Sequence, residues 1–366
     1  WQCLYLCNAD RMRQAVILGS VDTKRTIYLK RAAEREGVPV TFVDWQDFHE
    51  HHTLPAAEAL FIKIDPPLWT SSSLGMLKEL TDDYIDQLGQ LSGLARHRAV
   101  TFLNTPAVIE GLLDKRACKR KLQQAGLPVT ETVQMPDCMK DGNAAVEQLL
   151  AEMRRQRVHQ VFIKPVKGSG AAGVSALRWN ARTGQMALYT CALLDADASL
   201  VNTKRLRRFS KTADILPLLS QILALDCIVE RWYAKAVHQG CSYDLRAVVQ
   251  DGRLDFLLAR LSKDGPITNL HLNNHPLEAA ALGLSEQTLQ DIASLCRDCM
   301  ALYPGLRSAG IDILLEKGHL QPRIIEMNAQ GDLIYQDIYH ENVIYSQQVR
   351  MIKKWLNKNN GEEKNE

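Results

Sequence analysis

The chain has 366 residues, of which 46% are hydrophobic and 23% charged, a composition typical of a globular protein with two or three domains. Lysine and arginine (44) nearly balance aspartate and glutamate (42), so the net charge of +2 predicts no bulk attraction to nucleic acid or to an anionic membrane. The sequence contains no apolar run of about 18 residues, and no secretory signal pattern is visible.

Nine cysteines are scattered along the chain without an extracellular pattern, which predicts a reduced, cytoplasmic setting. Cys296 and Cys299 form a C-x-x-C pair, but they fall within a helical pattern of apolar residues. We therefore expect a core helix face there rather than a metal or redox site, and we interpret Cys3 and Cys7 in the same way. Because the first residue is not methionine, the sequence leaves open whether the native N-terminus is present.

The first hundred residues alternate between strand and helix signals. Apolar runs bounded by glycine and proline predict strands, and apolar residues at helical spacing predict helices, the first of which ends at Gly37. The predicted strands are 15–20, 38–44, 58–64 and 100–104, and the predicted helices are 24–36 and 74–94. This order is typical of a doubly wound α/β domain, which we expect to span 1–104.

The rest of the chain predicts a second unit of mixed α and β structure. Thr105 and Pro106 combine an N-cap with a first-turn proline, so we place a domain boundary and a helix start there. The predicted helices that follow are 114–125, 285–302 and 344–357. We expect an α/β protein whose N-terminal domain precedes two subdomains, 105–235 and 236–357, and a tail, 358–366.

The strongest local signal is a glycine-rich segment, 161–174, that follows an apolar strand. Its glycines allow tight turns that bring backbone amides toward phosphate oxygens, and its lysines supply positive charge. These residues are Lys164, Lys167, Gly168, Gly170 and Gly173. The spacing of a Walker loop is absent. For the loop alone, a glycine hairpin turn with solvated lysines is an equally good interpretation.

Two apolar strands near the C-terminus carry Asp312, Glu326 and Asn328. A turn at 317–319 predicts that the strands form a hairpin. Glu326 and Asn328 are two residues apart and point to one face, where Asp312 could lie opposite them. Two carboxylates and an amide oxygen suit Mg²⁺ shared with nucleotide phosphates. The alternative is a solvent-exposed face, but the apolar neighbours on both sides favour a buried strand.

Taken together, these segments resemble the ATP-grasp superfamily, and in particular its RimK-type amino-acid ligases and D-alanine ligases, over 105–335. The resemblance implies that ATP lies between two sheets under the glycine-rich loop. Segment 227–233 resembles the family's hinge over the adenine, with backbone groups of Glu230 and Trp232 paired to the base. The implied nucleotide-binding residues are Lys115, Lys164, Lys167, Gly168, Ser169, Gly170, Glu230, Trp232 and Tyr233.

The resemblance also implies a magnesium site and a catalytic group. Asp312, Glu326 and Asn328 fall on the family's magnesium positions, and Arg246 lies in a segment that resembles its D-x-R strand, next to the terminal phosphate. Arg260, one strand later, could steady a transition-state oxyanion or pair with a neighbouring acid.

Two segments depart from the family pattern. RimK-type ligases carry Asn-Leu-His-Arg-Gly-Gly, whereas 269–274 keeps Asn269 but has Leu272 in place of the arginine and asparagines in place of the glycines. After the metal asparagine the family continues Ser-x-Pro-Gly, whereas 329–332 reads Ala-Gln-Gly-Asp. Both segments face the acceptor in the family, so the resemblance does not imply which acceptor is used.

Two polar clusters carry weaker signals. The basic run 204–211 could clamp an acidic peptide or nucleic acid, but a solvated loop is the favoured interpretation. His49, His51 and His52 could bind a metal, but we expect a surface loop because no further ligand is identifiable.

The expected function is therefore an ATP- and Mg²⁺-dependent ligase that activates a carboxylate as an acyl phosphate for attack by an amine. The expected partner is a small molecule or peptide; no membrane or nucleic acid is expected, and the oligomeric state is open. Two alternatives remain: an ATP-binding regulatory or scaffold protein of the same fold without turnover, and an ATP-grasp kinase.

Overall fold

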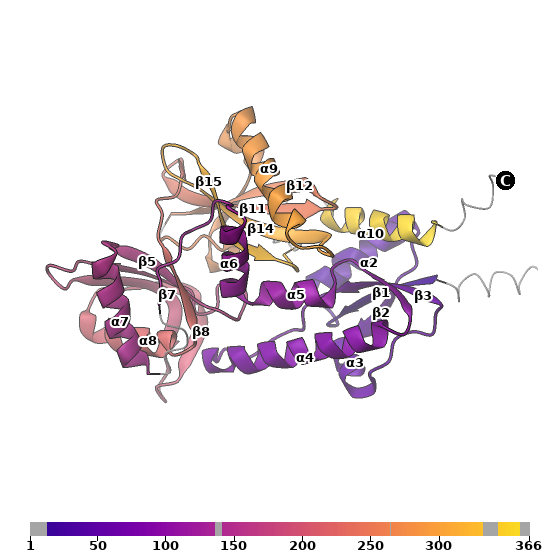
Figure 1. Cartoon of the computed structure of the whole chain (residues 1–366), viewed down its shortest axis with the longest axis horizontal. Helices are drawn as coiled ribbons and strands as arrows, with labels where there is room; N and C mark the ends of the chain where they lie inside the picture. Colours follow the sequence, from indigo (N-terminus) through magenta and orange to yellow (C-terminus); the bar gives the residue numbers. More distant parts are fainter. Residues whose placement is uncertain (1–12, 136–140, 264, 332–342, 359–366) are drawn as a thin grey trace, which may run out of the picture.

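Three β-sheets organise the described part of the computed structural model, which comprises residues 13–135, 141–263, 265–331 and 343–358 (Figure 1). No helix in these segments is both long enough and apolar enough to cross a membrane. Cys3, Cys7 and Asp332 lie outside the described residues.

The first sheet has four parallel strands in the order β2-β1-β3-β4. Thr23 caps the first helix, α2 (Lys24–Glu36), which ends at Gly37 with a φ of 62°, as predicted. The second strand starts later than predicted because Pro39 has no amide hydrogen and the Val38 amide bonds to Ala33 to close that helix. The elements are β1 (Arg13–Gly19), α2 (Lys24–Glu36), β2 (Thr41–Asp44), α3 (Trp45–His51), β3 (Ala59–Ile64), η1 (Leu74–Met76), α4 (Leu77–Ala95) and β4 (Ala99–Phe102).

The last helix, α10 (Val343–Leu356), packs on this first sheet although it is distant in sequence. Tyr345, Val349 and Ile352 form a core with residues of β1 and α2, and Figure 1 shows α10 beside α2. The sequence prediction assigned this helix to the unit 236–357. Its apolar stripe is buried against the N-terminal sheet instead.

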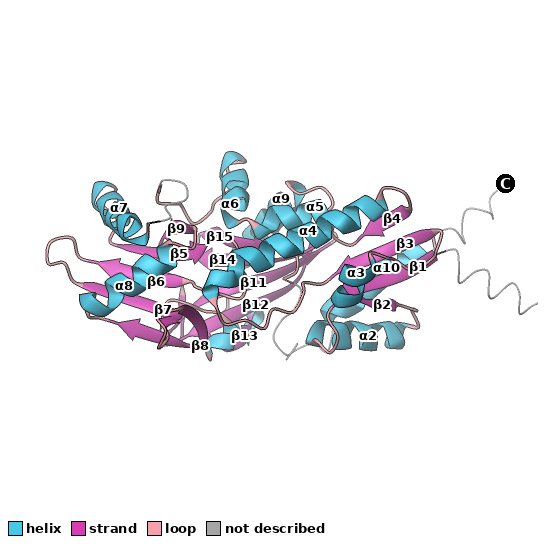
Figure 2. Ribbon diagram, turned by 90° about the horizontal axis from the view of Figure 1, so that it is seen from below, coloured by secondary structure: helices cyan, strands magenta, loops and turns pink. Residues whose placement is uncertain are grey.

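The second sheet is antiparallel, in the order β8-β7-β6-β5-β9. Two helices cover one of its faces and form a separate apolar core with it. Figure 2 shows these helices on the same side of the strands. The elements are α7 (Gly142–Arg155), β5 (Gln160–Pro165), β6 (Ser175–Trp179), β7 (Met186–Leu194), β8 (Leu200–Phe209), α8 (Thr212–Leu223) and β9 (Cys227–Arg231).

The third sheet, β13-β12-β11-β14-β15 with β10 paired to β11, is also antiparallel. Ser285 caps the long helix of this unit, α9 (Glu286–Ala301), at the predicted helix start. Cys296 and Cys299 are free thiols buried on this helix, so the interpretation of a core helix face is confirmed. The elements are β10 (Val237–His238), β11 (Cys241–Gln250), β12 (Arg253–Ser262), η2 (Leu270–Leu272), β13 (His275–Glu278), η3 (Ala279–Leu282), α9 (Glu286–Ala301), β14 (Ser308–Leu315) and β15 (Pro322–Asn328).

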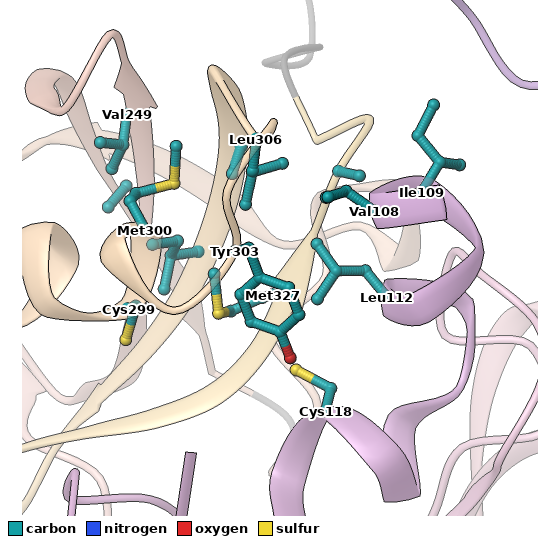
Figure 3. Packing of buried hydrophobic residues seen from close by; sticks show 14 of the residues in the cluster. Val108, Ile109, Leu112, Cys118, Val249, Cys299, Met300, Tyr303, Leu306 and Met327 are labelled. Carbon is teal, nitrogen blue, oxygen red and sulfur yellow. The ribbon is translucent and has the colours of Figure 1, made fainter. Parts of the chain in front are cut away.

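Two short helices, α5 (Pro106–Leu113) and α6 (Lys115–Gln124), join the first sheet to the third. Thr105 and Asp114 cap them through side-chain oxygens. Figure 3 shows the core that fixes them: Leu112 lies near Met327, and the Cys118 sulfur faces the Tyr303 hydroxyl. Because α6 is held against β15, its first residue, Lys115, is fixed beside that strand.

Two sequence interpretations are corrected by the fold. The histidine cluster is not a loop: His49 and His51 lie in the last turns of α3, which Asp44 caps, and His52 ends the helix. The basic run is not a solvated loop either, because Lys204 to Phe209 belong to β8. Within the described residues no group of three or more acidic, histidine or cysteine side chains could hold a metal ion, so the histidines do not form such a cluster.

Candidate active site

A cavity of about 750 Å³, open solvent included, lies between the second and third sheets. The glycine-rich loop covers one side, and the charged ends of β5, β9, β11, β12, β14 and β15 form the others. Residues that are far apart in the sequence therefore meet here. Those named from the sequence that line the cavity are Lys115, Lys164, Gly168, Ser169, Gly170, Glu230, Tyr233, Arg260, Asn269, Asp312 and Glu326.

The glycine-rich loop connects β5 to β6 and turns in conformations that favour glycine. Gly168, Gly170 and Gly173 have φ values of 125°, 62° and 69°. A Cβ on Gly173 would also lie 2.8 Å from Cγ of Pro165, so this position excludes a larger side chain. The Lys115 amine donates a hydrogen bond to the Gly168 carbonyl at 2.6 Å and so ties the loop to α6.

A buried cluster of two lysines and one carboxylate lies under this loop. Glu230 accepts from Lys164 at 2.8 Å and pairs with Lys119 at 3.2 Å. Thr130 completes the cluster by donating to Glu230 at 2.8 Å. These two lysines and one carboxylate carry a formal net charge of +1, which favours an anion at this end of the adjoining cavity.

The pKa directions in the cluster follow from burial and these charges. Burial alone would raise the pKa of Glu230, but Lys119 and Lys164 hold it at about 2. Burial alone would lower the pKa of Lys164, but Glu230 and Glu326 raise it. The pKa of Lys119 is lowered by its burial in spite of Glu230.

The predicted acidic hairpin is present, with Asp312 opposite Glu326 and Gly310 opposite Asn328 in the antiparallel pair β14–β15. This register places the three oxygen-bearing side chains on one face of the ladder. Asp312 and Glu326 line the cavity, whereas Asn328 does not. Glu326 lies 3.7 Å from the Lys115 amine, with about a quarter of its side chain exposed.

Asp312 is the end of a chain of buried charges across β11 and β12. It accepts from Arg246 at 2.6 Å and pairs with Arg260 at 3.3 Å. Arg260 in turn donates to Asp244 at 2.8 and 3.0 Å. Burial alone would raise the pKa of Asp312, but Arg246 and Arg260 lower it, so this carboxylate stays ionised.

Two residues that were not named from the sequence, Lys235 and Thr268, extend this chain of buried polar contacts beyond Asp244. Lys235 lies 3.5 Å from Asp244 and donates to Thr268 at 3.0 Å, and both of its partners line the cavity. The D-x-R segment contained Asp244, but its partners lie on other elements. Pairing of Arg260 with a neighbouring acid was one of its two expected roles, but nothing in the local sequence indicated Lys235 or Thr268.

The hinge resemblance implied that backbone groups of Glu230 and Trp232 pair with the base, and that pairing stays a prediction. The Trp232 amide donates to the Gln160 carbonyl at 3.2 Å, and its own carbonyl accepts from the Gln160 side chain at 2.9 Å. Trp232 does not line the cavity, and both of its backbone groups bond to Gln160 of β5. Glu230 contributes its side chain instead, because that is the group that holds the two lysines.

Arg246 lies behind Asp312 rather than on the cavity wall. One of its nitrogens donates to the Gly331 carbonyl at 3.1 Å. A Cβ on Gly310 would come within 2.9 Å of the same guanidinium, so glycine at this position leaves room for the arginine. The geometry gives Arg246 the role of orienting Asp312.

Lys167 also departs from its predicted role. Its amine pairs with Asp82 of α4 at 2.5 Å instead of lining the cavity. Leu77 of the same helix lies 3.3 Å from the position that a Cβ on Gly168 would take. Helix α4 runs from the first sheet toward the second (Figure 2), so this pair ties the glycine-rich loop to the N-terminal unit.

Asp82→Asn is expected to loosen the glycine-rich loop. Lys167 and Lys78 lower the pKa of Asp82, so the contribution of the ion pair is present above the ordinary carboxylate pKa and is lost as the pH falls below it. Hydrogen exchange of the amides at 168–173 should be severalfold faster in the variant at pH 7. The exposed neighbour Asp83→Asn is the matched control, and equal exchange in both variants would contradict the link.

The residues at the hairpin fit a magnesium ion. Mg²⁺ is usually held by one or two carboxylates together with water and substrate phosphates, and not by a complete protein cage. Asp312 and Glu326 supply two carboxylates on one face, beside the lysines that favour an anion.

The fold of the chain resembles that of solved ligases. The macrocyclase MdnC from Microcystis aeruginosa MRC, bound with its precursor peptide MdnA, aligns with a TM-score of 0.56 at 13% identity, over 93% of this chain and 100% of that one. The ATP-grasp ligase PsnB, solved with a variant of its minimal precursor, Mg and ADP, gives 0.54 at 15% identity, over 93% and 98%.

D-alanine–D-alanine ligase from Bacillus anthracis aligns with a TM-score of 0.51 at 11% identity, over 93% of this chain and 99% of that one. No protein-family model matches the sequence, and no curated protein matches it. At these identities the comparisons show the fold alone: the chain shares its α/β architecture with these solved ligases.

Proposed function

We propose that this protein is an ATP-dependent ligase that activates a carboxylate as an acyl phosphate for attack by an amine. The observation that carries the proposal is a single cavity in which a glycine-rich loop, buried lysines and a pair of carboxylates meet. The ATP-grasp fold supports it. We also propose that 1–104, 105–235 and 236–357 are its structural units and that 358–366 is a tail, with α10 returning to the first unit.

The chain offers groups for each part of the nucleotide. Backbone amides of the loop 168–170 and the amines of Lys115 and Lys164 face the cavity and would bind phosphate oxygens. Tyr233, on the segment after β9, lines the cavity and would contact the base. Glu230 holds Lys164 in place from beneath.

Asp312 and Glu326 would hold Mg²⁺, with Asn328 on the same strand face. When bound, the ion supplies positive charge next to the terminal phosphates of ATP. Arg246 and Arg260 keep Asp312 ionised and fixed in orientation for that purpose.

The proposed reaction has two steps. A carboxylate oxygen of the substrate bonds to the terminal phosphorus of ATP, and the bond to the bridging oxygen breaks, so ADP leaves. The amine nitrogen then bonds to the acyl carbon, phosphate leaves with the bonding electrons, and the nitrogen loses a proton. Arg260 and Asn269 line the cavity and would offset negative charge on the reacting acyl group.

A peptide is the substrate class that we propose for one or both reacting groups. MdnC and PsnB were solved with precursor peptides, and their chains align over nearly their full length with this one. The cavity is open to solvent between two sheets, which leaves room for a chain to reach it.

The first experiment measures binding. ATP with MgCl₂ at millimolar concentration should raise the melting temperature by several degrees, because a ligand that binds only the native state stabilises it. Lys164→Met should remove most of that shift, whereas Arg182→Gln, an exposed arginine in the turn between β6 and β7, should retain it. A wild-type protein without any shift would refute nucleotide binding.

The second experiment identifies products. With ATP, MgCl₂, hexaglutamate and hydroxylamine, an acyl phosphate is trapped as a hydroxamate, and ADP and phosphate are released. AMP and pyrophosphate would indicate adenylation instead. A stable phosphorylated product would favour a kinase, and ATP binding without turnover would favour a regulatory or scaffold protein.

A further inference from the structure

Strand β8 carries exposed cations at the outer edge of the second sheet. We define the basic stripe as Lys204, Arg205, Arg208 and Lys211, which are all exposed. None of them forms an ion pair with a carboxylate of the described residues. This contrasts with the cavity, where Lys164, Lys235 and Arg260 each pair with an acid. The stripe therefore offers uncompensated positive charge.

The first two cations stand on a large bulge. Opposite the single residue Cys191 of β7, β8 has four residues, 203–206. The Thr203 hydroxyl donates to the Cys191 carbonyl at 2.8 Å and accepts from the Arg207 guanidinium at 2.7 Å. The bulge is thus held by defined hydrogen bonds, and Lys204 and Arg205 project from an ordered backbone.

The bulge is also anchored to the wall of the cavity. Leu206 packs with Ile267 and Leu272 in a small apolar cluster. A Cβ on Gly265 would lie 2.7 Å from the Leu206 side chain, so the two segments are in close contact. The same segment supplies Pro266, Ile267, Thr268 and Asn269 to the cavity lining, so the stripe starts at the cavity wall.

Arg208 extends the stripe along the face of the sheet on which the cavity lies. Its guanidinium lies over the Tyr189 ring, 5.9 Å from the ring centre. Tyr189 contacts Trp232 edge-on, and Trp232 contacts Phe162, which lines the cavity. The opposite face of the sheet is covered by α7 and α8. Arg208 and the cavity therefore share one face of the sheet.

We propose that the basic stripe binds an acidic peptide segment of the substrate and guides it to the cavity. The proposal rests on the proposed ligase function and specifies the substrate class. Lys204, Arg205 and Arg208 present three separate cations opposite 189–191 of β7, more than a single carboxylate can neutralise, so a chain with several acidic side chains fits best. Arg178 and Arg208 already lie over the rings of Trp232 and Tyr189, which disfavours stacking of nucleic-acid bases on these two rings.

Peptide binding without turnover tests the proposal. Fluorescein-labelled octaglutamate should bind the wild-type protein in an anisotropy titration at 50 mM NaCl, and octaglutamine should not. The triple variant Lys204→Gln/Arg205→Gln/Arg208→Gln should bind octaglutamate about tenfold more weakly or worse, and 300 mM NaCl should weaken wild-type binding because exposed charges are screened. Arg182→Gln/Lys317→Gln, which neutralises exposed cations in turns away from β8, should match the wild type.

Three results would overturn the proposal: equal binding of octaglutamate to the wild type and the triple variant, equal binding of octaglutamine, or tighter binding of labelled oligo(dT)12, which would indicate a nucleic-acid surface. The melting-temperature shift with ATP and MgCl₂ is measured on the same proteins. A triple variant that keeps this shift is folded and retains the nucleotide site. Loss of peptide binding is then independent of whether the proposed ligase function holds.

Discussion

Glu326→Gln is expected to lower the rate of ADP formation by about two orders of magnitude or more while the protein remains folded. The substitution preserves shape and one acceptor oxygen but removes a charge from the carboxylate pair that would hold Mg²⁺. Glu326 is loosely paired, 3.7 Å from Lys115, and about a quarter of its side chain is exposed. Its loss therefore leaves no buried charge without a partner, and the effect on stability should be small.

Asp312→Asn should reduce turnover as strongly as Glu326→Gln does, but it should also lower the stability of the folded protein. Asp312 is buried between Arg246 and Arg260, and the neutral side chain would leave both guanidinium groups with less compensation. The double variant with Glu326→Gln should be no slower than either single variant, because both residues act at one site. Additive losses would show that the two carboxylates act separately.

The control for Glu326 lies on the same hairpin. Glu316 pairs with Arg323 at 3.3 Å and has the same exposed fraction, 25%, but it does not line the cavity. Glu316→Gln should keep full activity and the full dependence of the ATP melting-temperature shift on MgCl₂. If Glu326→Gln retains wild-type activity and the same magnesium dependence, the metal assignment is wrong.

Local signals in the sequence were sufficient for much of the fold. Caps at Thr105, Asp114 and Ser285 define helix starts through hydrogen bonds within three residues, so they can be recognised without the tertiary structure. The period of two in a strand likewise placed Glu326 and Asn328 on one face. These are short-range rules, and the structure follows them.

The parts that sequence reasoning missed depend on long-range contacts. Lys167 was predicted to bind phosphate. Its actual partner, Asp82, is 85 residues away on another unit, so the local sequence did not indicate this ion pair. The dense positive charge at 204–211 favoured a solvated loop, but 204–209 belong to strand β8, which pairs with β7. The packing of α10 on the first sheet is of the same kind, because an amphipathic helix does not specify which surface it covers.

Glu230→Gln is expected to cause the largest loss of stability, about 3–5 kcal/mol in the free energy of unfolding, because it removes the one carboxylate that both buried lysines contact directly. The side chains of Glu230, Lys119 and Lys164 are only 3%, 4% and 8% exposed, so water cannot compensate. Urea denaturation at pH 7 measures the loss. Glu152→Gln, which removes a carboxylate from an ion pair of α7 with exposed Arg155, should change the midpoint very little.

The dependence on pH gives a second, independent signature of the Glu230 cluster. Its lysines hold the pKa of Glu230 at about 2, below the ordinary value of 4.5, so the carboxylate stabilises the fold above the ordinary value and this contribution disappears as the pH falls toward 2. This lowering of the Glu230 pKa corresponds to about 3 kcal/mol in the free energy of unfolding. The stability gap between wild type and Glu230→Gln should therefore be full at pH 6 to 7 and narrow below pH 4.5.

A triple variant separates pairing from packing in this cluster. Replacing all three charges, Glu230→Leu/Lys119→Met/Lys164→Met, removes the burial cost together with the attraction, so it should destabilise the protein less than Glu230→Gln alone. It should also lose the melting-temperature shift with ATP and MgCl₂, since Lys164 is gone from the cavity wall. A triple variant that is less stable than the single one would mean that the cluster is held by shape and hydrogen bonding. A triple variant that still responds to ATP would place the phosphates away from Lys164.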